Sequence, residues 1–412
     1  MMKIGRVRAL EILDSRGNPT LQARVELHSG AVGTAQVPSG KSTGKHEAHE
    51  LRDRDPARFH SMGVASAVAN VEKVLGPAVT DLDAGHQSLI DARLIETDGT
   101  ANKSRLGANA VLAVSCAVAR AAAAAKAIPL WTHLVNTFGT KPELPVPMVN
   151  ILSGGHHAVG GRHAEFQDFM VIPRAYPDLL SALEAVVKVH RQAHQLLLKS
   201  GYVINGVADE GGWGPDLPSN ELGISLLREA VEECGTHMDI ALDVAASHFS
   251  DHGLYRLDGG TRTSVQMIEL FTPWIDRFGI VSIEDALAED DWQGWNELTT
   301  RLGSRVRLVG DDLFVTNIAR LDRGIEAGAA NSILVKMNQI GTLTETFAVI
   351  LRAATAGYKA VISARSGETE DSFLADLAVA SGAGQIKIGS ITRSERLAKY
   401  NRLLEIERWE MI

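Results

Sequence analysis

The feature that most constrains this chain is a series of short apolar segments that each end in a charged or polar residue. These segments recur through the second half of the chain, and their ends lie 22 to 41 residues apart. A strand, a helix and two connecting loops need about that many residues. Serial strand–helix units predict a parallel sheet that is buried on both faces. The segments are 239–243, 280–285, 307–311, 332–336, 360–366 and 385–387.

The residues at the ends of these segments predict a functional site. Because the carboxyl ends of the strands meet on one face of a barrel, we expect the end residues to lie together there. The sequence therefore predicts an α/β fold, a (β/α) barrel with its site on that face. The acidic ends are Asp243, Glu284 and Asp311, and the basic ends are Lys336, Arg365 and Lys387.

Three carboxylates from three strand ends suit a magnesium ion. Mg²⁺ prefers oxygen ligands in near-octahedral geometry, and burying several carboxylates is costly unless a cation offsets their charge. We therefore expect Asp243, Glu284 and Asp311 to bind the ion. The alternative is that the three residues are unrelated helix caps.

Two lysines and one glutamate are candidates for proton transfer. A lysine beside a divalent ion has its ammonium form disfavoured, so Lys336 or Lys387 can serve as a general base. Ion pairing with the carboxylates explains both lysines equally well. Glu210 precedes two glycines, and a carboxyl group held near other acids can stay protonated and act as a general acid. A solvated turn is the alternative for Glu210.

The first part of the chain shows no strand–helix repeat. Residues 7–13, 20–27 and 31–37 have strand character around turns, and helical patterns follow at 57–75, 85–96 and 109–127. Prolines at 145 and 147 mark the start of the second part. We therefore predict two domains, an α+β domain over residues 1–130 and the barrel over residues 140–412.

Composition and net charge limit the classes of partner that this protein is expected to bind. The net charge is −9 and the chain has no basic run, which argues against nucleic acid or an anionic membrane as a partner. Its two cysteines share no metal-ligand spacing and fit a reducing, cytoplasmic location. The N-terminus has no apolar segment typical of a signal peptide. The most apolar segment, 111–128, is interrupted by two cations and is expected to be a buried helix rather than a membrane span.

Eight motifs, in this order along nearly the whole chain, resemble the enolase family of magnesium-dependent phosphopyruvate hydratases. They are residues 14–20, the loop around Ser42, and residues 209–212, 282–285, 310–313, 336–341, 365–371 and 393–399. The resemblance implies an enolase-like modified (β/α)8 TIM barrel with an N-terminal α+β capping domain. It also implies assembly as a homodimer or a larger homo-oligomer.

The resemblance also implies roles for residues of the site. It places a first Mg²⁺ on Asp243, Glu284 and Asp311, and a second Mg²⁺, which arrives with substrate, on Ser42. It makes Lys336 the base that removes the proton α to the substrate carboxylate, and Glu210 the acid that helps the β-hydroxyl leave. The residues that would hold a small anionic substrate, such as 2-phosphoglycerate or phosphoenolpyruvate, are His157, Gln167, Arg365, Ser366 and Lys387.

Several positions depart from the enolase pattern. Ala364 stands where enolases carry His, and Asp168 stands where they carry Glu. Both changes are expected to weaken acid assistance to water loss, which typically contributes about 10²–10⁴-fold. Lys41 and Arg162 add cations on loops expected to face the site, as a second anionic ligand would need. We include Asp168 and Lys41 among the expected substrate-binding residues.

These departures favour an enolase paralogue repurposed to make an enolpyruvate product. Carboxyphosphonoenolpyruvate, in the biosynthesis of phosphonate or phosphinate natural products, is an example of such a product. The alternative is an ordinary enolase, a 2-phosphoglycerate dehydratase of glycolysis. A catalytically dead binding protein is the weakest hypothesis, because Lys336, Glu210 and all three acids are present.

Overall fold

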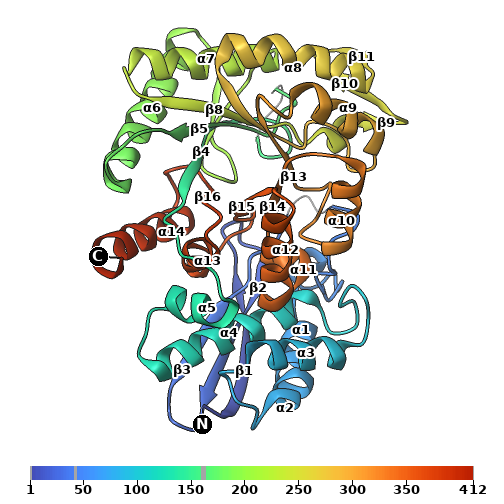
Figure 1. Ribbon diagram of the computed structural model, residues 1–412, viewed down its shortest axis with the longest axis vertical. Coiled ribbons are helices and arrows are strands. Elements are labelled where there is room, and N and C mark those ends of the chain that lie inside the picture. The colour runs from blue at the N-terminus through green and yellow to red at the C-terminus, as the bar shows by residue number, and fades with distance from the viewer. Residues whose placement is uncertain (1, 41–43, 159–163, 412) are drawn as a thin grey trace.

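The computed structural model describes residues 2–40, 44–158 and 164–411, and Figure 1 shows a barrel standing on a smaller N-terminal part. Three residues singled out by sequence, Lys41, Ser42 and Arg162, lie outside the described residues. The predicted α/β barrel is confirmed. Within the described residues eight strands close in the order β4-β5-β8-β12-β13-β14-β15-β16, and β16 pairs with β4.

The barrel strands follow the apolar segments of the sequence. They are β4 (Val146–Ser153), β5 (Asp168–Pro173), β8 (Met238–Asp243), β12 (Ile280–Glu284), β13 (Arg307–Gly310), β14 (Ser332–Val335), β15 (Lys359–Ser363) and β16 (Gln385–Gly389). Two shorter strands, β6 (Ile204–Val207) and β7 (Trp213–Pro215), extend the sheet beside β4. A separate small sheet contains β9 (Ser250–Asp251), β10 (Leu254–Leu257) and β11 (Gly260–Arg262).

The prediction of a wholly parallel sheet is wrong at one strand. β5 pairs antiparallel with both β4 and β8, while the other neighbouring barrel strands pair in parallel. The amino-terminal end of β5 therefore meets the carboxyl ends of its neighbours, with Asp168 opposite both Ser153 and Asp243. Apolar spacing along a chain carries no information on strand direction, so the sequence pattern could not show this reversal.

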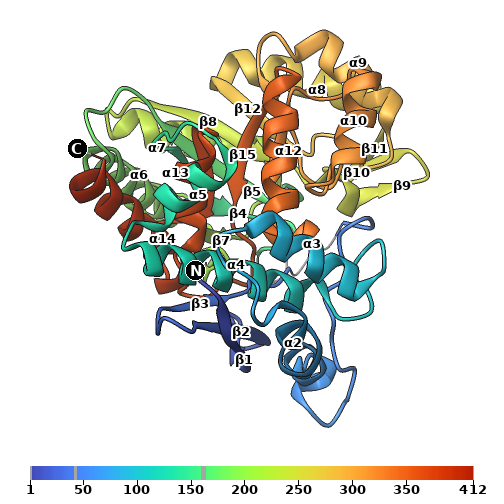
Figure 2. The same ribbon diagram turned by 60° about the horizontal axis from the view of Figure 1, so that its bottom comes forward.

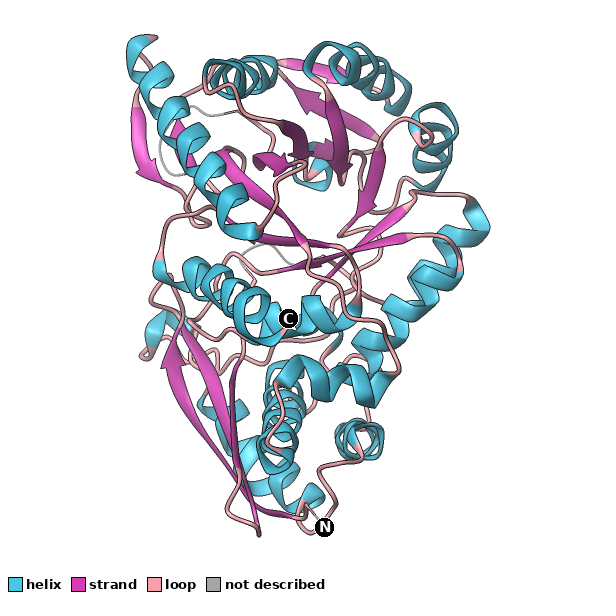
Figure 3. Cartoon of the chain, turned by 60° about the vertical axis from the view of Figure 1, so that its left-hand side comes forward, coloured by secondary structure: helices cyan, strands magenta, loops and turns pink. Residues whose placement is uncertain are grey.

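Helices surround the barrel (Figures 1 and 3). They are α6 (Leu179–Lys199), α7 (Asn220–Glu233), α8 (Ser264–Phe278), α9 (Trp292–Leu302), α10 (Ile318–Ala327), the short α11 (Met337–Ile340), α12 (Leu343–Thr355), α13 (Phe373–Ser381) and α14 (Ser394–Glu405). Thr342 caps α12 by accepting a hydrogen bond from the amide of Glu345, and Gly357 follows the end of the helix with a positive φ of 81°.

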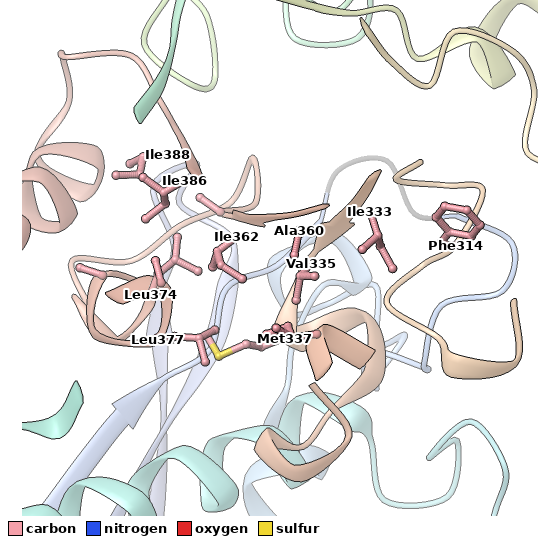
Figure 4. Packing of buried hydrophobic residues seen from close by; sticks show 14 of the residues in the cluster. Phe314, Ile333, Val335, Met337, Ala360, Ile362, Leu374, Leu377, Ile386 and Ile388 are labelled. Atoms are coloured by element: carbon pink, nitrogen blue, oxygen red, sulfur yellow. The ribbon is translucent and has the colours of Figure 1, made fainter. Parts of the chain in front are cut away.

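Two apolar layers hold the barrel together. Outside it, strand residues such as Ile362 and Ile386 pack with helix residues such as Leu374 and Leu377 (Figure 4). Inside it, a separate cluster takes seven residues from six strands. Its fully or nearly fully buried members are Met148, Met170, Ile172, Ala241, Val309, Leu334 and Val361. Strand residues alternate between the two faces, so the residue two positions beyond each interior residue also points into the barrel. Near the carboxyl ends of the strands, such residues lie at the barrel mouth.

The N-terminal part is an α+β layer, as predicted. Its antiparallel sheet contains β1 (Ile4–Leu13), β2 (Pro19–Leu27) and β3 (Val32–Gln36), and its helices are α1 (Ala65–Asn70), α2 (Gly76–Val79), α3 (Gln87–Asp98), α4 (Ala108–Lys126) and α5 (Leu130–Phe138). The first predicted helix begins later than residue 57. The Asp53 carboxylate accepts hydrogen bonds from the amides of Ala65 and Ser66, which sets the start of α1 there.

Helix α4 is the predicted buried helix. By length and composition it is the one helix among the described residues that is apolar enough to cross a membrane, but 83% of its most apolar window is buried inside the fold. It packs against β2 and β3 on one side and against α3 and α5.

The exposed Leu10 on β1 faces Gln22 on β2 across the sheet.

The N-terminal part lies against the carboxyl-terminal end of the barrel. Ser39 and Gly367 exchange two backbone hydrogen bonds of 2.7 and 3.0 Å. The guanidinium group of Arg120 on α4 forms a bidentate ion pair with Asp371, at 2.6 and 2.8 Å. Helix α3 lies beside α12 (Figure 2), where the Thr344 hydroxyl donates to Asp91. These contacts bring loops of the N-terminal part over the mouth of the barrel.

Candidate active site

The three acids predicted to bind metal lie at the carboxyl ends of adjacent strands β8, β12 and β13, and all three are buried. Lys387 bridges the first two: its Nζ lies 2.7 Å from Asp243 Oδ2 and 2.8 and 2.9 Å from the two carboxylate oxygens of Glu284. Lys336 Nζ donates to Asp311 Oδ2. The ion-pairing interpretation of both lysines is therefore realised in this structure.

A fourth acid fixes the turn that carries Asp311. The two carboxylate oxygens of Asp285 accept the backbone amides of Asp311 and Asp312, each at 2.8 Å. These three side chains also form a group that could hold a metal ion, with one ligand atom from each lying within 4.8 Å of the others. Gln339 Nε2 donates to Asp311 Oδ1 at 2.9 Å and restrains the side chain itself.

This acidic cluster fits a divalent cation. Burial, and after it the charge of Asp243, raises the pKa of Glu284 well above its usual value. Burial and the charge of Asp312 likewise raise the pKa of Asp285 well above its usual value. A hard cation with oxygen ligands offsets this accumulated negative charge. The donor set, which consists of buried carboxylates on rigid strand ends, is the set that Mg²⁺ prefers.

Glu210, the candidate for the general acid, lies across the barrel mouth from the lysines. Glu210 is buried, and its Oε1 lies 3.9 Å from His157 Nε2. Burial would raise the pKa of Glu210, but nearby cations, with His157 first, lower it on balance. Burial would lower the pKa of His157, but the charges of Asp168 and Glu210 raise it on balance. The pair therefore favours an imidazolium next to a carboxylate.

Asp168 is drawn into the barrel wall. It is fully buried, and its Oδ1 accepts hydrogen bonds from Asn150 Nδ2 at 2.5 Å and from Ser153 Oγ at 3.1 Å. His157 Nδ1 lies 3.1 Å from Asp168 Oδ2. The neighbouring Gln167 donates to Asp243 Oδ2 at 3.1 Å, and its buried Oε1 has no hydrogen-bond partner among the described residues.

The basic end of β15 is held by a residue that sequence reasoning missed. Arg365 is buried and forms a bidentate ion pair with Glu47, at 2.9 and 3.3 Å. Arg365 Nη1 also donates to Asn338 Oδ1 at 3.0 Å. Ser366 is buried next to it. Glu47 lies in the N-terminal part, three residues after Gly44, and no spacing in the sequence links it to β15.

Ala364 occupies the remaining position of interest. It lies at the end of β15 with 5% of its surface exposed, and its amide donates to the carbonyl of Lys387. Its methyl group offers neither a proton nor a hydrogen bond to a ligand. The sequence does not predict that the rings of His156 and His248 stack beside the site. Their ring centroids lie 4.1 Å apart.

Residues of the motif at 393–399 contact the loop that carries Arg365 and Ser366. The guanidinium group of the fully buried Arg396 donates to the carbonyls of Arg365, Ser366 and Ile388. Lys399 is also fully buried and pairs with Glu368 at 2.8 Å. These cations tie the loop after β15 to α14, so the motif has a structural role.

Two family models match this chain in succession. The model described as the enolase N-terminal domain matches residues 4–134. The model described as the enolase C-terminal TIM barrel domain matches residues 141–410.

Proposed function

The chain belongs to the enolase family, and from that premise we propose that it is a Mg²⁺-dependent enzyme that acts on a substrate of the 2-phosphoglycerate or phosphoenolpyruvate type. We further propose that it has been repurposed to make an enolpyruvate product, such as carboxyphosphonoenolpyruvate. The observation that carries the second proposal is the state of the acid side of the site. Ala364 offers no proton, and Asp168 is committed to Asn150, Ser153 and His157.

Asp243, Glu284 and Asp311 would hold the cation, with Ser42 as an expected ligand of a second ion outside the described residues. When bound, the cation stabilises the negative charge that develops on the substrate carboxylate. Lys336 lies beside these acids and is proposed to take the proton α to that carboxylate. Arg365, Ser366 and Gln167 are proposed to orient the phosphate and carboxylate groups of the substrate.

Loss of a β-hydroxyl needs a proton donor on the leaving oxygen. Glu210 would have to supply it alone, and its lowered pKa favours the ionised form, which has no proton to give. Removal of the α proton at Lys336 does not depend on these changes. A site that keeps its base and acid cluster but lacks acid assistance is suited to enolate chemistry other than rapid dehydration. We propose that Lys41 contributes to binding a second anionic substrate.

Ordinary enolase activity is the second candidate. It is supported by the presence of Lys336, Glu210 and the three acids together in one buried site.

One assay separates the two. Purified full-length protein is incubated with 2-phosphoglycerate and Mg²⁺, and phosphoenolpyruvate is followed by its absorbance. We expect little turnover, and we expect the double variant Ala364→His/Asp168→Glu to gain about 10²–10⁴-fold in rate. Turnover by the unaltered protein at tens per second or more, as is typical of enzymes, would establish ordinary enolase activity instead. The variant Lys188→Ala, an exposed lysine on α6, controls for preparation effects.

A further inference from the structure

The barrel has a second opening at the amino-terminal ends of its strands, opposite the candidate active site. A cavity of about 730 Å³ lies there. Its charged lining residues are Arg174, Asp239, Arg305, Arg307 and Lys359. An adjoining cavity of about 380 Å³ shares Arg307 and Lys359 and adds Glu143. Pockets that bind small molecules are typically about 300–1,000 Å³ in volume.

The alternation of strand residues places these charges inside the barrel. On β13, Val309 belongs to the interior apolar cluster. Arg307 precedes it by two residues and Asp311 follows it by two, so all three face the interior. The same strand thus brings an acid to one mouth of the barrel and an arginine to the other. On β15, Lys359 precedes the interior residue Val361 in the same way.

Two of the cations in the cavity, Arg307 and Lys359, have no ion pair within the described part of the chain. Arg174 pairs with Asp239, and Arg305 pairs with Asp276 at 2.5 Å. Neither Arg307 nor Lys359 has an ion pair anywhere in residues 2–40, 44–158 and 164–411; in particular, neither pairs with Asp239 or Glu143. The lining of the larger cavity therefore carries four cations against one carboxylate.

Three buried polar atoms at or near Arg307 also have no hydrogen-bond partner among the described residues. Its Nη1 is buried without a hydrogen-bond partner among the described residues, as are Ser282 Oγ and Gln385 Oε1, which line the same cavity. Burial lowers the pKa of Arg307, yet a guanidinium stays charged in proteins. A partly buried charge without a counter-ion is costly. Arg365 and Arg120, by contrast, are each paired with a carboxylate.

We propose that the amino-terminal mouth of the barrel is a second anion-binding site, where Arg307 and Lys359 hold a phosphate dianion, either free or as the phosphate group of a small metabolite. The planar guanidinium group suits bidentate contact with phosphate oxygens, and lysine adds a point charge. Apolar side chains at Val146, Ile172 and Val281 line the cavity and would contact the body of a phosphate ester. The interior apolar cluster separates this site from the acids at the other mouth.

The test is calorimetric titration of inorganic phosphate into the full chain. Arg365→Gln serves as the background, because it removes an expected phosphate ligand from the candidate active site. We expect this variant to retain one phosphate site. Adding Arg307→Gln should weaken that site about 10- to 100-fold, as expected for lost hydrogen bonds to a charged group. Adding Lys359→Gln, at an exposed position that does not endanger folding, should weaken it in the same direction.

The matched control is Arg301→Gln, which removes the same charge from the exposed face of α9 and should leave the titration unchanged. If Arg365→Gln binds no phosphate up to about 10 mM, or if Arg307→Gln leaves the remaining binding intact, the proposal is wrong. Thermal unfolding gives a second reading: phosphate should raise the Tm of the Arg365→Gln background but not that of the double variant with Arg307→Gln. A parallel titration with phenyl phosphate separates the two sources, since tighter binding of the ester indicates a phosphorylated metabolite.

Discussion

Lys336 directly follows β14 and Lys387 lies within β16, and the two lysines contact different acids of the cluster. Lys387 contacts Asp243 and Glu284, and these charges raise its pKa well above the usual value against the effect of burial. Among the described residues Lys336 forms an ion pair only with Asp311; burial lowers its pKa, but Asp311 raises it on balance. A cation that shares Asp311 would weaken this hold on Lys336. Lys336 is therefore the better candidate for the base, and Lys387 for a binding group.

Replacing Lys336 by Ala should abolish whichever activity the protein has. The α proton would lose its acceptor, and general base catalysis typically contributes about 10²–10⁴-fold. The measurement is the steady-state rate with 2-phosphoglycerate, or exchange of its α proton with solvent deuterium followed by NMR. Lys188→Ala, at an exposed position on α6, is the control. An unchanged exchange rate in Lys336→Ala would show that the base is a different residue.

At the scale of elements, the loop that carries Glu210 is braced by helix α6. The indole N–H of Trp213 donates to the main-chain carbonyl of His190 at 2.9 Å. The indole also stacks on the imidazole of His190, with 4.8 Å between the ring centroids. His194, one turn further along α6, lies 4.3 Å from the same indole. Burial lowers the pKa of His190 to about 4. The neutral imidazole is therefore part of the packing that positions the acidic loop.

This packing predicts a loss of stability in mild acid. The pKa of His190 is about 4 in the folded protein and about 6.5 in an unfolded chain, so the unfolded state takes up its proton first. The contribution of His190 to the free energy of unfolding is complete above pH 6.5 and is lost as the pH falls towards 4. In urea unfolding, His190→Phe should show a smaller decrease over this range.

The control for this experiment is His252→Phe, because His252 is 96% exposed and should leave the pH dependence unchanged. An identical pH dependence in His190→Phe and the unaltered protein would mean that His190 titrates normally in the folded state.

At the scale of the whole molecule, the site depends on how the N-terminal part is fastened to the barrel. Glu47 of the N-terminal part contacts Arg365 of the barrel, and Ser39 contacts Gly367. Asp371 makes three such contacts: it accepts two hydrogen bonds from Arg120 and a third from the amide of Gln36. This one side chain holds both β3 and α4 against the loop after β15.

Asp371→Asn should therefore loosen the two parts from each other. Removing one partner leaves the largely buried guanidinium of Arg120 without its counter-charge, at a cost of about 1–3 kcal/mol. Denaturant unfolding measures this cost, and limited proteolysis should show faster cleavage between the parts. Asp322→Asn is the matched control, because its pair with Arg352 is exposed and worth about 1 kcal/mol or less. Equal effects of the two variants would contradict the proposed role of Asp371.

The sequence by itself determined the barrel, the strand ends and the acids that meet there. It could do so because the spacing of apolar segments and the identity of the residue that ends each one are properties of the chain read in order. The family resemblance of the motifs is of the same kind, and both family models bear it out. The late start of α1 was missed because its cap, Asp53, lies twelve residues before Ala65.

Only the tertiary structure decided which distant residues became partners. It reversed β5, so that Asp168 came to lie opposite Asp243 and was tied to Asn150 and Ser153. It paired Arg365 with Glu47, 318 residues apart in sequence, and left Arg307 at the other mouth without an ion pair among the described residues. Partner choice of this kind depends on strand direction, closure of the barrel and docking of the N-terminal part. None of these is encoded in local spacing, because each emerges only when the whole core is packed.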